Sequence, residues 1–407
     1  MGSQQQEKKH QALQDEKKQP KALQDEGVQS DKVCPYRKKC GGCVYQGMPY
    51  DEQLSLKQKE VEKQIGKFGK VQKIVGMNYP YYYRNKVHAF FDFEKGKTLC
   101  GTYQEGTHRV VPIESCLIDD QHADKIVLTI RDLIRSFKIK VYDEGAGYGV
   151  FRRVLIRRAQ ATGEVMVVLV TASPVFPSKN NFVKALKEKH PEITTVVQNI
   201  NEKHTSMVLG PRNVTLYGKG YIIDNLCGMA FAISPSTFYQ VNPLQTKKLY
   251  NKAMEYAALT GWETVIDAYC GIGTIGMIAA EKAGKVIGVE LNGESVKNAR
   301  NNAKHNNIKN IQFYQNDASV FMDQMALRAE KADVIFMDPP RSGSTDVFIM
   351  SCVALRPERI VYISCSPETL GRDLELFQKF GYRMQEATPV DMFPWTGHIE
   401  VVCLLGK

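Results

Sequence analysis

The sequence predicts an α/β protein whose C-terminal half is a doubly wound, mostly parallel sheet and whose preceding part is rich in strands. From residue 264 onward, apolar runs of strand length alternate with helix-length segments, which is typical of repeated βαβ units. Before residue 230, strand-like runs follow one another with few helical segments between them. We therefore divide the chain into a polar tail at 1–32, a central domain at 33–230 and a C-terminal domain at 231–407.

The composition is that of a globular protein with a basic surface. At 407 residues and 43% hydrophobic content, the chain is long enough to bury ordinary cores. No apolar segment reaches the roughly 18 to 20 residues that span a bilayer, and the N-terminus lacks the apolar region of a signal peptide. We expect no membrane partner and a cytoplasmic protein, in which the cysteines serve as thiols, metal ligands or catalysts. The net charge of +10 favours a polyanionic partner, although a merely basic enzyme explains it equally well.

The N-terminal part contains a tail and then a cysteine motif. Residues 1–32 are polar and charged, and we expect a disordered or loosely helical tail there. Cys34, Cys40 and Cys43 follow, spaced by five and two residues and accompanied by glycines that allow a tight turn round an ion or cluster. A fourth ligand is needed, and the sequence offers Cys100 and Cys116. Both zinc and an iron-sulfur cluster fit this spacing.

The central part combines strands with basic and aromatic side chains. The expected strands are Val87–Phe93, Gly149–Arg158, Glu164–Thr171, Thr194–Asn199 and Asn213–Ile223. Cationic and aromatic residues alternate at 81–86 and again at 151–158. This mixture suits RNA, because phosphates need cations and unstacked bases need aromatic surfaces. A sheet with one solvated basic face would show the same pattern.

Three features of the C-terminal half point to a nucleoside cofactor. A G-x-G-x-x-G turn at 271–276 joins a strand to a helix, and the next strand ends in Glu290, whose carboxylate can accept hydrogen bonds from ribose hydroxyls. Asp267 precedes the turn, where it would repel a pyrophosphate but suit a cationic amino acid group. Asp338 opens a D-P-P-R motif at the end of a further strand, where prolines hold a rigid edge beside a flat base. The combination favours S-adenosylmethionine over NAD.

A candidate nucleophile ends another strand. Residues 361–367, V-Y-I-S-C-S-P, predict a buried strand that delivers Cys365 to its carboxyl edge. A lone cysteine at a strand end is more often a small hydrophobic residue than a nucleophile. However, Asp338 ends a neighbouring strand and Glu400 precedes another, so that a cysteine and two acids share one sheet edge. Cys365 is therefore our candidate for attack on an electrophilic carbon.

The motifs at 267–276, 338–341, 364–373 and 393–400 together resemble those of the RNA uracil-5 methyltransferases. The resemblance runs from Cys34 to the C-terminus and is strongest to the iron-sulfur-containing branch that acts on 23S rRNA. It implies a Rossmann-like S-adenosylmethionine-dependent methyltransferase domain, preceded by a strand-rich central domain that carries a [4Fe-4S] cluster. It also implies an RNA partner, with 23S rRNA favoured over tRNA, and we expect a monomer.

The resemblance further assigns roles to individual residues. It implies Cys34, Cys40, Cys43 and Cys116 as cluster ligands, Gln240, Tyr269, Glu290 and Asp338 as cofactor-binding residues, Cys365 as nucleophile, Glu400 as base, and Phe238 as the aromatic that fills the gap left by a flipped base. Uracil C5 becomes nucleophilic only after attack at C6, and the C5 proton must leave before the thiolate is expelled. Because a stacked base is unreachable, the target uridine must flip into the pocket.

This chain departs from the family pattern at three places. Residues 1–33 are too short and polar for the family's N-terminal RNA-binding barrel, Ser366 stands where the family has asparagine, and Arg153 stands where histidine is usual. Two alternatives remain open. Methylation of uracil 54 in tRNA would use the same chemistry, and a noncatalytic iron-sulfur RNA-binding protein would have no use for Cys365 and Glu400 together.

Overall fold

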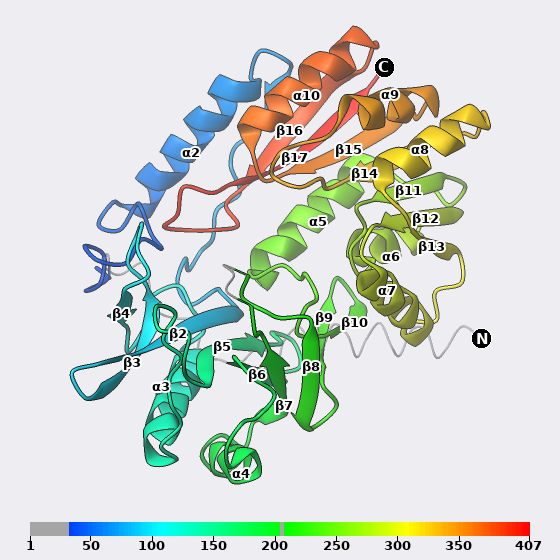
Figure 1. The fold of residues 1–407 in the computed structure, drawn as a ribbon. Helices are drawn as coiled ribbons and strands as arrows, with labels where there is room; N and C mark the ends of the chain where they lie inside the picture. The colour runs from blue at the N-terminus through cyan, green and yellow to red at the C-terminus, as the bar shows by residue number, and fades with distance from the viewer. Residues whose placement is uncertain (1–31, 204–206) are drawn as a thin grey trace, which may run out of the picture. The chain divides into compact units, whose positions relative to one another are not determined.

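The computed structural model describes residues 32–203 and 207–407 (Figure 1). The tail predicted for residues 1–32 lies outside the described residues apart from Lys32. Within the described ranges, every helix is too short or too polar to cross a lipid bilayer.

The C-terminal half forms an eight-stranded sheet. Its order is β1 (Lys70–Val71), β16 (Arg383–Val390), β17 (Glu400–Gly406), β15 (Arg359–Ser364), β14 (Val334–Met337), β11 (Thr264–Ala268), β12 (Lys285–Glu290) and β13 (Ile311–Gln315). All neighbouring pairs are parallel except those of β17, which runs antiparallel to both β15 and β16. The predicted α/β class and the mostly parallel sheet are confirmed.

Helices cover both faces of this sheet, as Figure 1 shows. One face packs against α5 (Pro243–Ala257), α6 (Thr274–Ala280) and α7 (Gly293–His305), and the other against α2 (Tyr50–Ile65), α8 (Ala318–Leu327), α9 (Asp346–Ala354) and α10 (Pro367–Lys379). Successive residues of β11 therefore enter opposite cores, with Val265 in the first and Ile266 in the second. This double burial explains why the strands are continuous apolar runs rather than alternating ones.

The central part forms a separate seven-stranded sheet. Its order is β4 (Val110–Pro112), β3 (Lys97–Tyr103), β2 (Lys86–Glu94), β5 (Phe151–Arg158), β6 (Val165–Thr171), β7 (Ile193–Ile200) and β8 (Arg212–Tyr217). Helices α3 (Gln121–Ser136) and α4 (Lys179–Lys189) pack on one face of it. A hairpin of β9 (Ile222–Leu226) and β10 (Met229–Ile233) follows and leads to α5.

The residues between the cysteine motif and the central sheet pack on the C-terminal sheet. β1 pairs in parallel with β16, and α2 buries Val61 and Ile65 in the same core as α10. Residues 50–71 thus contact the sheet formed by residues 264–406, although they precede it by about half the chain. The domain boundaries at 33 and 231 remain a prediction.

Candidate functional site

One edge of the eight-stranded sheet collects the polar residues singled out from the sequence. The parallel strands β11, β12, β14 and β15 all end at this edge, and the antiparallel strand β17 begins there. The residues at these strand ends are Tyr269, Glu290, Asp338, Cys365 and Glu400. Five side chains spread over more than 130 residues of sequence are thereby brought to one place, where ligands bind in open α/β sheets.

Cys365 and Glu400 are neighbours because of strand register. Ser364, the last residue of β15, pairs with Val401 of β17, so the two candidate catalytic residues flank one cross-strand pair. Glu400 is 5% exposed, whereas Cys365 is partly exposed. The thiol therefore faces accessible space beside a buried carboxyl group.

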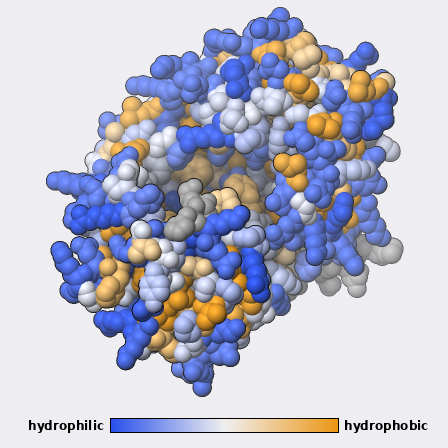
Figure 2. Space-filling view, viewed as in Figure 1, coloured by the Kyte–Doolittle hydropathy of each residue, from blue (hydrophilic) through white to orange (hydrophobic). Residues whose placement is uncertain are grey.

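A pocket lies beside Asp338, whose charge contributes to the raised pKa of both Cys365 and Glu400. It is lined by Gln240, Tyr269 and Asp338, three of the four predicted cofactor-binding residues, together with Phe238 and the turn at Gly271. Figure 2 shows the surface hollowed in the part of the view where Figure 1 draws α5, whose first residues follow the segment that carries Phe238 and Gln240. Phe238 is 68% exposed and is therefore available for contact with a partner.

The glycine turn at 271–276 admits no larger residue at two positions. Gly273 has φ of +83°, and a Cβ there would come within 2.7 Å of Phe313. A Cβ on Gly276 would come within 2.8 Å of Asp267, whose Oδ2 accepts a 2.7 Å hydrogen bond from the Gly276 N–H. Asp267 therefore holds the turn closed, while its buried Oδ1 has no hydrogen-bond partner among the described residues.

Glu290 is oriented by backbone donors. Its Oε2 accepts from the Gly271 N–H at 3.1 Å and its Oε1 accepts from the Asn292 N–H at 2.7 Å. Because each carboxylate oxygen has two lone pairs, both can accept a further hydroxyl group. The aromatic walls, the glycine turn and this oriented acid fit an adenine-ribose-amino acid molecule such as S-adenosylmethionine.

Burial dominates the electrostatics of the site. Loss of solvent raises the pKa of Asp267 to about 8 and that of Asp338 to about 7, and it raises the pKa of Glu400 well above its ordinary value with a further contribution from Asp338. Burial, Glu400 and Asp338, in that order, raise the pKa of Cys365 to about 11. The arrangement therefore favours a neutral thiol and at least one protonated carboxyl group before substrate binds.

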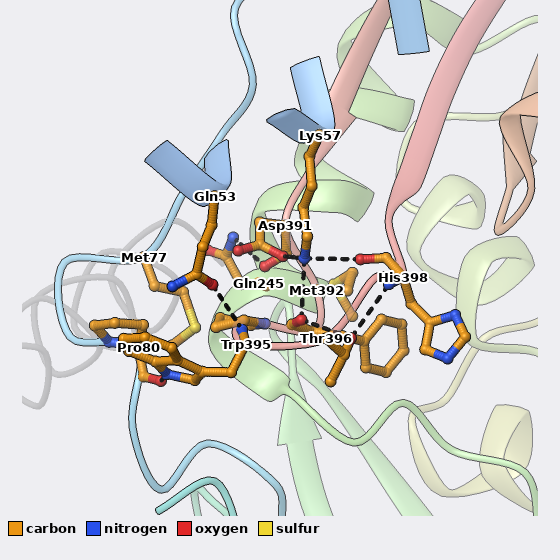
Figure 3. Close-up of polar contacts among 12 residues, drawn as sticks. Gln53, Lys57, Met77, Pro80, Gln245, Asp391, Met392, Trp395, Thr396 and His398 are labelled. Atoms are coloured by element: carbon orange, nitrogen blue, oxygen red, sulfur yellow. Dashed lines mark hydrogen bonds and ion pairs between the residues drawn. The ribbon is translucent and has the colours of Figure 1, made fainter. Parts of the chain in front are cut away.

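A buried lysine holds the loop that leads to Glu400 (Figure 3). Lys57 of α2 donates to Asp391 Oδ1 at 2.6 Å, to the Phe393 carbonyl at 3.1 Å and to the His398 carbonyl at 2.9 Å. Its side chain is 2% exposed and that of Asp391 is fully buried. All three donor positions of the ammonium group are thus used to fold residues 391–398 back on themselves, immediately before the candidate base.

Hydrogen bonds also join this loop to residues that lie close to the cysteine motif in sequence. Trp395 donates from its indole Nε1 to the Pro80 carbonyl at 2.6 Å and from its backbone to Gln53 Oε1 at 3.1 Å, as Figure 3 shows. Its carbonyl accepts from the backbone N–H groups of Val44 and Tyr45, both at 3.0 Å. The segment directly after the cysteine motif is therefore bonded to a residue five positions before Glu400.

The four predicted cluster ligands lie in one region of the molecule. Cys43 and Cys116 both pack beside Trp395 and its apolar neighbours. Burial, followed by Cys40 and then Cys34, raises the pKa of Cys43 to about 12, so these three thiols are within electrostatic range of one another. Among residues 32–203 and 207–407, however, no three His, Cys, Asp or Glu side chains are arranged to hold a metal ion. The thiols are grouped but do not form a ligand set in this structure.

Lys57 and Gln53 are site residues that sequence reasoning missed. Both belong to α2, a helix of mostly polar and charged residues. A signal was present, because Gln53, Lys57, Val61 and Ile65 recur every four residues and are all buried. Two polar residues on the apolar stripe of a helix indicate buried hydrogen-bond partners.

Ser366, one of the departures from the family pattern, has a local structural role. Its side-chain oxygen accepts from the Thr369 N–H at 3.4 Å at the start of α10, and Pro367 occupies the first turn. Serine is a preferred N-cap residue and proline a preferred first helical residue. The substitution at 366 therefore keeps the turn after Cys365.

Comparisons with known proteins extend over most of the chain. A family model described as tRNA (uracil-5-)-methyltransferase matches residues 227–407. A protein from Halalkalibacterium halodurans named as an uncharacterized RNA methyltransferase is 42% identical over 377 residues, which cover 91% of this chain and 82% of that protein. Another so named, from Caldanaerobacter subterraneus, is 41% identical over 379 residues, with 92% and 84% covered.

A solved structure resembles nearly the whole fold. The crystal structure of the Pyrococcus abyssi tRNA (uracil-54, C5)-methyltransferase in complex with S-adenosyl-L-homocysteine has a TM-score of 0.76 and 26% sequence identity. The match covers 93% of this chain and 87% of that chain. The likeness therefore includes the central sheet as well as the sheet that carries the site.

Proposed function

This chain belongs to the family of RNA uracil-5 methyltransferases, and we propose that it methylates C5 of a uridine in 23S rRNA through a covalent bond from Cys365 to C6. The observation that carries the proposal is the meeting of Cys365, Glu400 and Asp338 beside the pocket at the carboxyl edge of the sheet. The noncatalytic alternative is set aside because the family is one of enzymes.

The pocket residues would hold S-adenosylmethionine, which supplies the methyl group from its sulfonium. Glu290, already fixed by the Gly271 and Asn292 N–H groups, would accept the ribose hydroxyls. Gln240, Tyr269 and Asp338 line the pocket and would enclose the remainder of the molecule. Water exclusion by these walls strengthens each polar contact inside.

Cys365 would begin the reaction on the uracil ring. Its thiol would lose its proton to solvent, and the sulfur would add to C6, so that the electron pair of the C5–C6 double bond becomes available at C5. C5 would then take the methyl group from the sulfonium, whose sulfur keeps the bonding electron pair and becomes a neutral thioether. The partial exposure of Cys365 and the nearby pocket support this order, because Cys365 could reach C6 and a methyl donor in the pocket could reach C5 of the same ring from one edge of the sheet.

Glu400 would complete the reaction as the base. The C5 proton passes to its carboxylate, the C5–C6 double bond re-forms and the C6–S bond breaks, which returns Cys365 as thiolate. The raised pKa of Glu400, caused by burial and then by Asp338, makes it a stronger proton acceptor than an exposed carboxylate. The Lys57-held loop before Glu400 would keep this base in place.

Phe238 is proposed to occupy the space that the flipped uridine leaves in the RNA. Its ring is 68% exposed although it lies at the pocket wall, and an exposed aromatic of this kind can replace a base in a stack.

The choice between rRNA and tRNA needs a direct test. We favour 23S rRNA from the cysteine motif, while the tRNA alternative draws support from the Pyrococcus abyssi enzyme's action on uracil 54. Unmodified 23S rRNA and tRNA transcripts should be incubated with the protein and S-adenosylmethionine, digested to nucleosides and analysed by mass spectrometry, with Cys365→Ala as control. We expect 5-methyluridine in the rRNA. Its appearance only in tRNA would replace the rRNA proposal, and its absence from both would overturn the activity.

We further propose that Cys34, Cys40, Cys43 and Cys116 ligate a [4Fe-4S] cluster. The spacing of the first three thiols, their mutual electrostatic influence and the burial of Cys43 and Cys116 beside Trp395 support this assignment. No catalytic step is assigned to the cluster, because methyl transfer moves no net electrons. A zinc ion is the alternative, and the visible absorption of protein purified without oxygen distinguishes the two, since only the cluster is coloured.

A further inference from the structure

Helices α3 and α4 cover one face of the seven-stranded sheet, and on the other face Leu155, Met166 and Val168 pack in a core with β9, β10 and α5, a core that includes no residue of β2 or β3. On β2, Val87, Ala89 and Phe91 enter the core beneath α3 and α4, so the alternate residues Lys86, His88 and Phe90 face the other way. These three pair across the sheet with Arg157, Leu155 and Arg153 of β5, respectively. This second face therefore carries two buried arginines, Arg153 and Arg157, beside the partly buried Lys86 and Phe90.

A stack of side chains crosses three strands on this face. The Arg153 guanidinium lies 5.3 Å from the centre of the Phe90 ring. Phe90 stacks on Tyr103 with ring centres 3.9 Å apart and planes 26° from parallel, and Tyr103 meets His108 edge-on at 5.4 Å. Exposure to solvent increases along the stack. Arg153 is 5% exposed, Phe90 and Tyr103 are half-buried, and His108 is exposed.

The cations of this face have few partners. The buried Nε atoms of Arg153 and Arg157 have no hydrogen-bond partner among the described residues. The ion pair that the structure gives Arg153 is a 3.7 Å contact with Glu144. Buried donors without acceptors cost free energy, and this cost indicates a site for an anionic ligand.

Residues at the other end of the strands that carry Phe90 and Arg153 are bonded to the segment that carries Phe238. The Arg157 Nη2 donates to the carbonyl of Thr237, and the Asn85 N–H donates to the carbonyl of Val241 at 2.9 Å. Arg153 is four residues from Arg157 on the same strand face, or about 13 Å at the usual strand rise of ~3.3 Å per residue. An RNA segment of a few nucleotides could therefore reach from the pocket to the stack.

We propose that Phe90, Tyr103 and His108, backed by Arg153, form a stacking platform for unpaired RNA bases that flank the target uridine. Bases stack on aromatic rings whatever their identity, and adjacent guanidinium groups neutralise the phosphates between them. The net charge of +10 complements such a strand. The platform rests on RNA being the substrate, but it is independent of the roles proposed for Cys365 and Glu400.

Binding measurements test the platform without requiring methyl transfer. The probe is a fluorescein-labelled, single-stranded 12-nucleotide oligouridine, and its affinity is measured by fluorescence anisotropy for wild type, Phe90→Leu, Tyr103→Leu and Phe93→Leu. Phe93 is the matched control, because it is 61% exposed on the same strand. It lies on the same face as Phe91, which is the face opposite to that of Phe90. We expect Phe90→Leu and Tyr103→Leu each to weaken RNA binding at least fivefold and Phe93→Leu to leave the affinity unchanged. Fivefold corresponds to about 1 kcal/mol, the lower end of the free energy of one base–aromatic stack.

A second measurement uses the unaltered protein. RNA containing 4-thiouridine beside the target uridine is irradiated in the complex, and cross-linked peptides are identified by mass spectrometry. Cross-links within residues 90–108 support the platform. Wild-type affinity in both variants, or cross-links confined to peptides outside 90–108, would overturn it. Because anisotropy measures RNA affinity and not methyl transfer, its outcome separates a failure of this inference from a failure of the proposed chemistry.

Discussion

Cys365 lies where burial and two carboxyl groups, those of Glu400 and Asp338, raise the pKa of its thiol to about 11. A thiolate is the reactive form, so the free protein holds its proposed nucleophile mostly protonated at neutral pH. Protonation of the neighbouring acids lessens the repulsion, and burial raises the pKa of both acids. The acids therefore set how readily the thiolate forms.

Replacing Glu400 by Gln should lower the pKa of Cys365. The carboxylate of Glu400 destabilises the nearby thiolate, so removing its negative charge stabilises the thiolate and moves deprotonation to lower pH. The measurement is the rate of iodoacetamide labelling of the Cys365 peptide as a function of pH. Cys227 in the same samples is the internal control, because the charges that affect its thiol are Lys247 and Glu281. An unchanged profile for Cys365, or a shift to higher pH, would contradict the electrostatic account.

Glu290→Ala should weaken S-adenosylmethionine binding by about 1.5–3 kcal/mol, the cost of losing hydrogen bonds to a charged group. The carboxylate is already oriented by Gly271 and Asn292, so little ordering is needed when the ribose binds. Glu290→Gln keeps one oxygen acceptor and should retain part of the affinity. Isothermal titration calorimetry measures both variants, and equal affinity for wild type and Glu290→Ala would exclude Glu290 from the cofactor site.

At the scale of elements, the parallel strands were predictable because helices cover both of their faces and make them continuously apolar. Their common carboxyl edge then places Tyr269, Asp338 and Cys365 together. The packing of α2 was not predictable. The four-residue spacing of Lys57, Val61 and Ile65 indicates one buried face of the helix, but it does not indicate which sheet or which carboxylate that face contacts.

Lys57→Met should destabilise the protein by about 3–5 kcal/mol, because it leaves the buried carboxylate of Asp391 without its ion pair. The same change releases the carbonyls of Phe393 and His398 that hold the loop before Glu400. Urea unfolding monitored by circular dichroism measures the free energy. Lys67→Met is the matched control, since Lys67 forms an exposed ion pair with Glu375 and its replacement should leave the free energy of unfolding nearly unchanged. Similar losses for the two variants would show that Lys57 is not a buried anchor.

At the scale of the whole molecule, the structure joins regions that the sequence separates. The cysteine motif is more than 300 residues in sequence from the proposed catalytic residues. In the folded chain, Val44 and Tyr45 are bonded to Trp395, in the loop that leads to Glu400. No local pattern could predict this contact, because it depends on how α2 packs against the C-terminal sheet.

Cys116→Ser should lower the iron content of protein purified without oxygen, whereas Cys100→Ser should leave it unchanged. Cys116 and Cys43 both pack against the apolar cluster that contains Trp395, whereas Cys100 is buried in the core beneath α3. Iron is measured by inductively coupled plasma mass spectrometry and the cluster by its visible absorption. Iron lost from the Cys100 variant and retained by the Cys116 variant would reverse the assignment of the fourth ligand.

The covalent mechanism is tested most directly by trapping protein on RNA. If Cys365 attacks C6 and Glu400 removes the C5 proton, Glu400→Gln should transfer one methyl group and then stall, since the thiolate cannot leave while that proton remains. With RNA and S-adenosylmethionine, a denaturing gel should show a stable adduct for Glu400→Gln, none for Cys365→Ala and none for the double variant. Omission of S-adenosylmethionine shows whether stalling follows methyl transfer. An adduct in Cys365→Ala, or normal turnover by Glu400→Gln, would contradict the account.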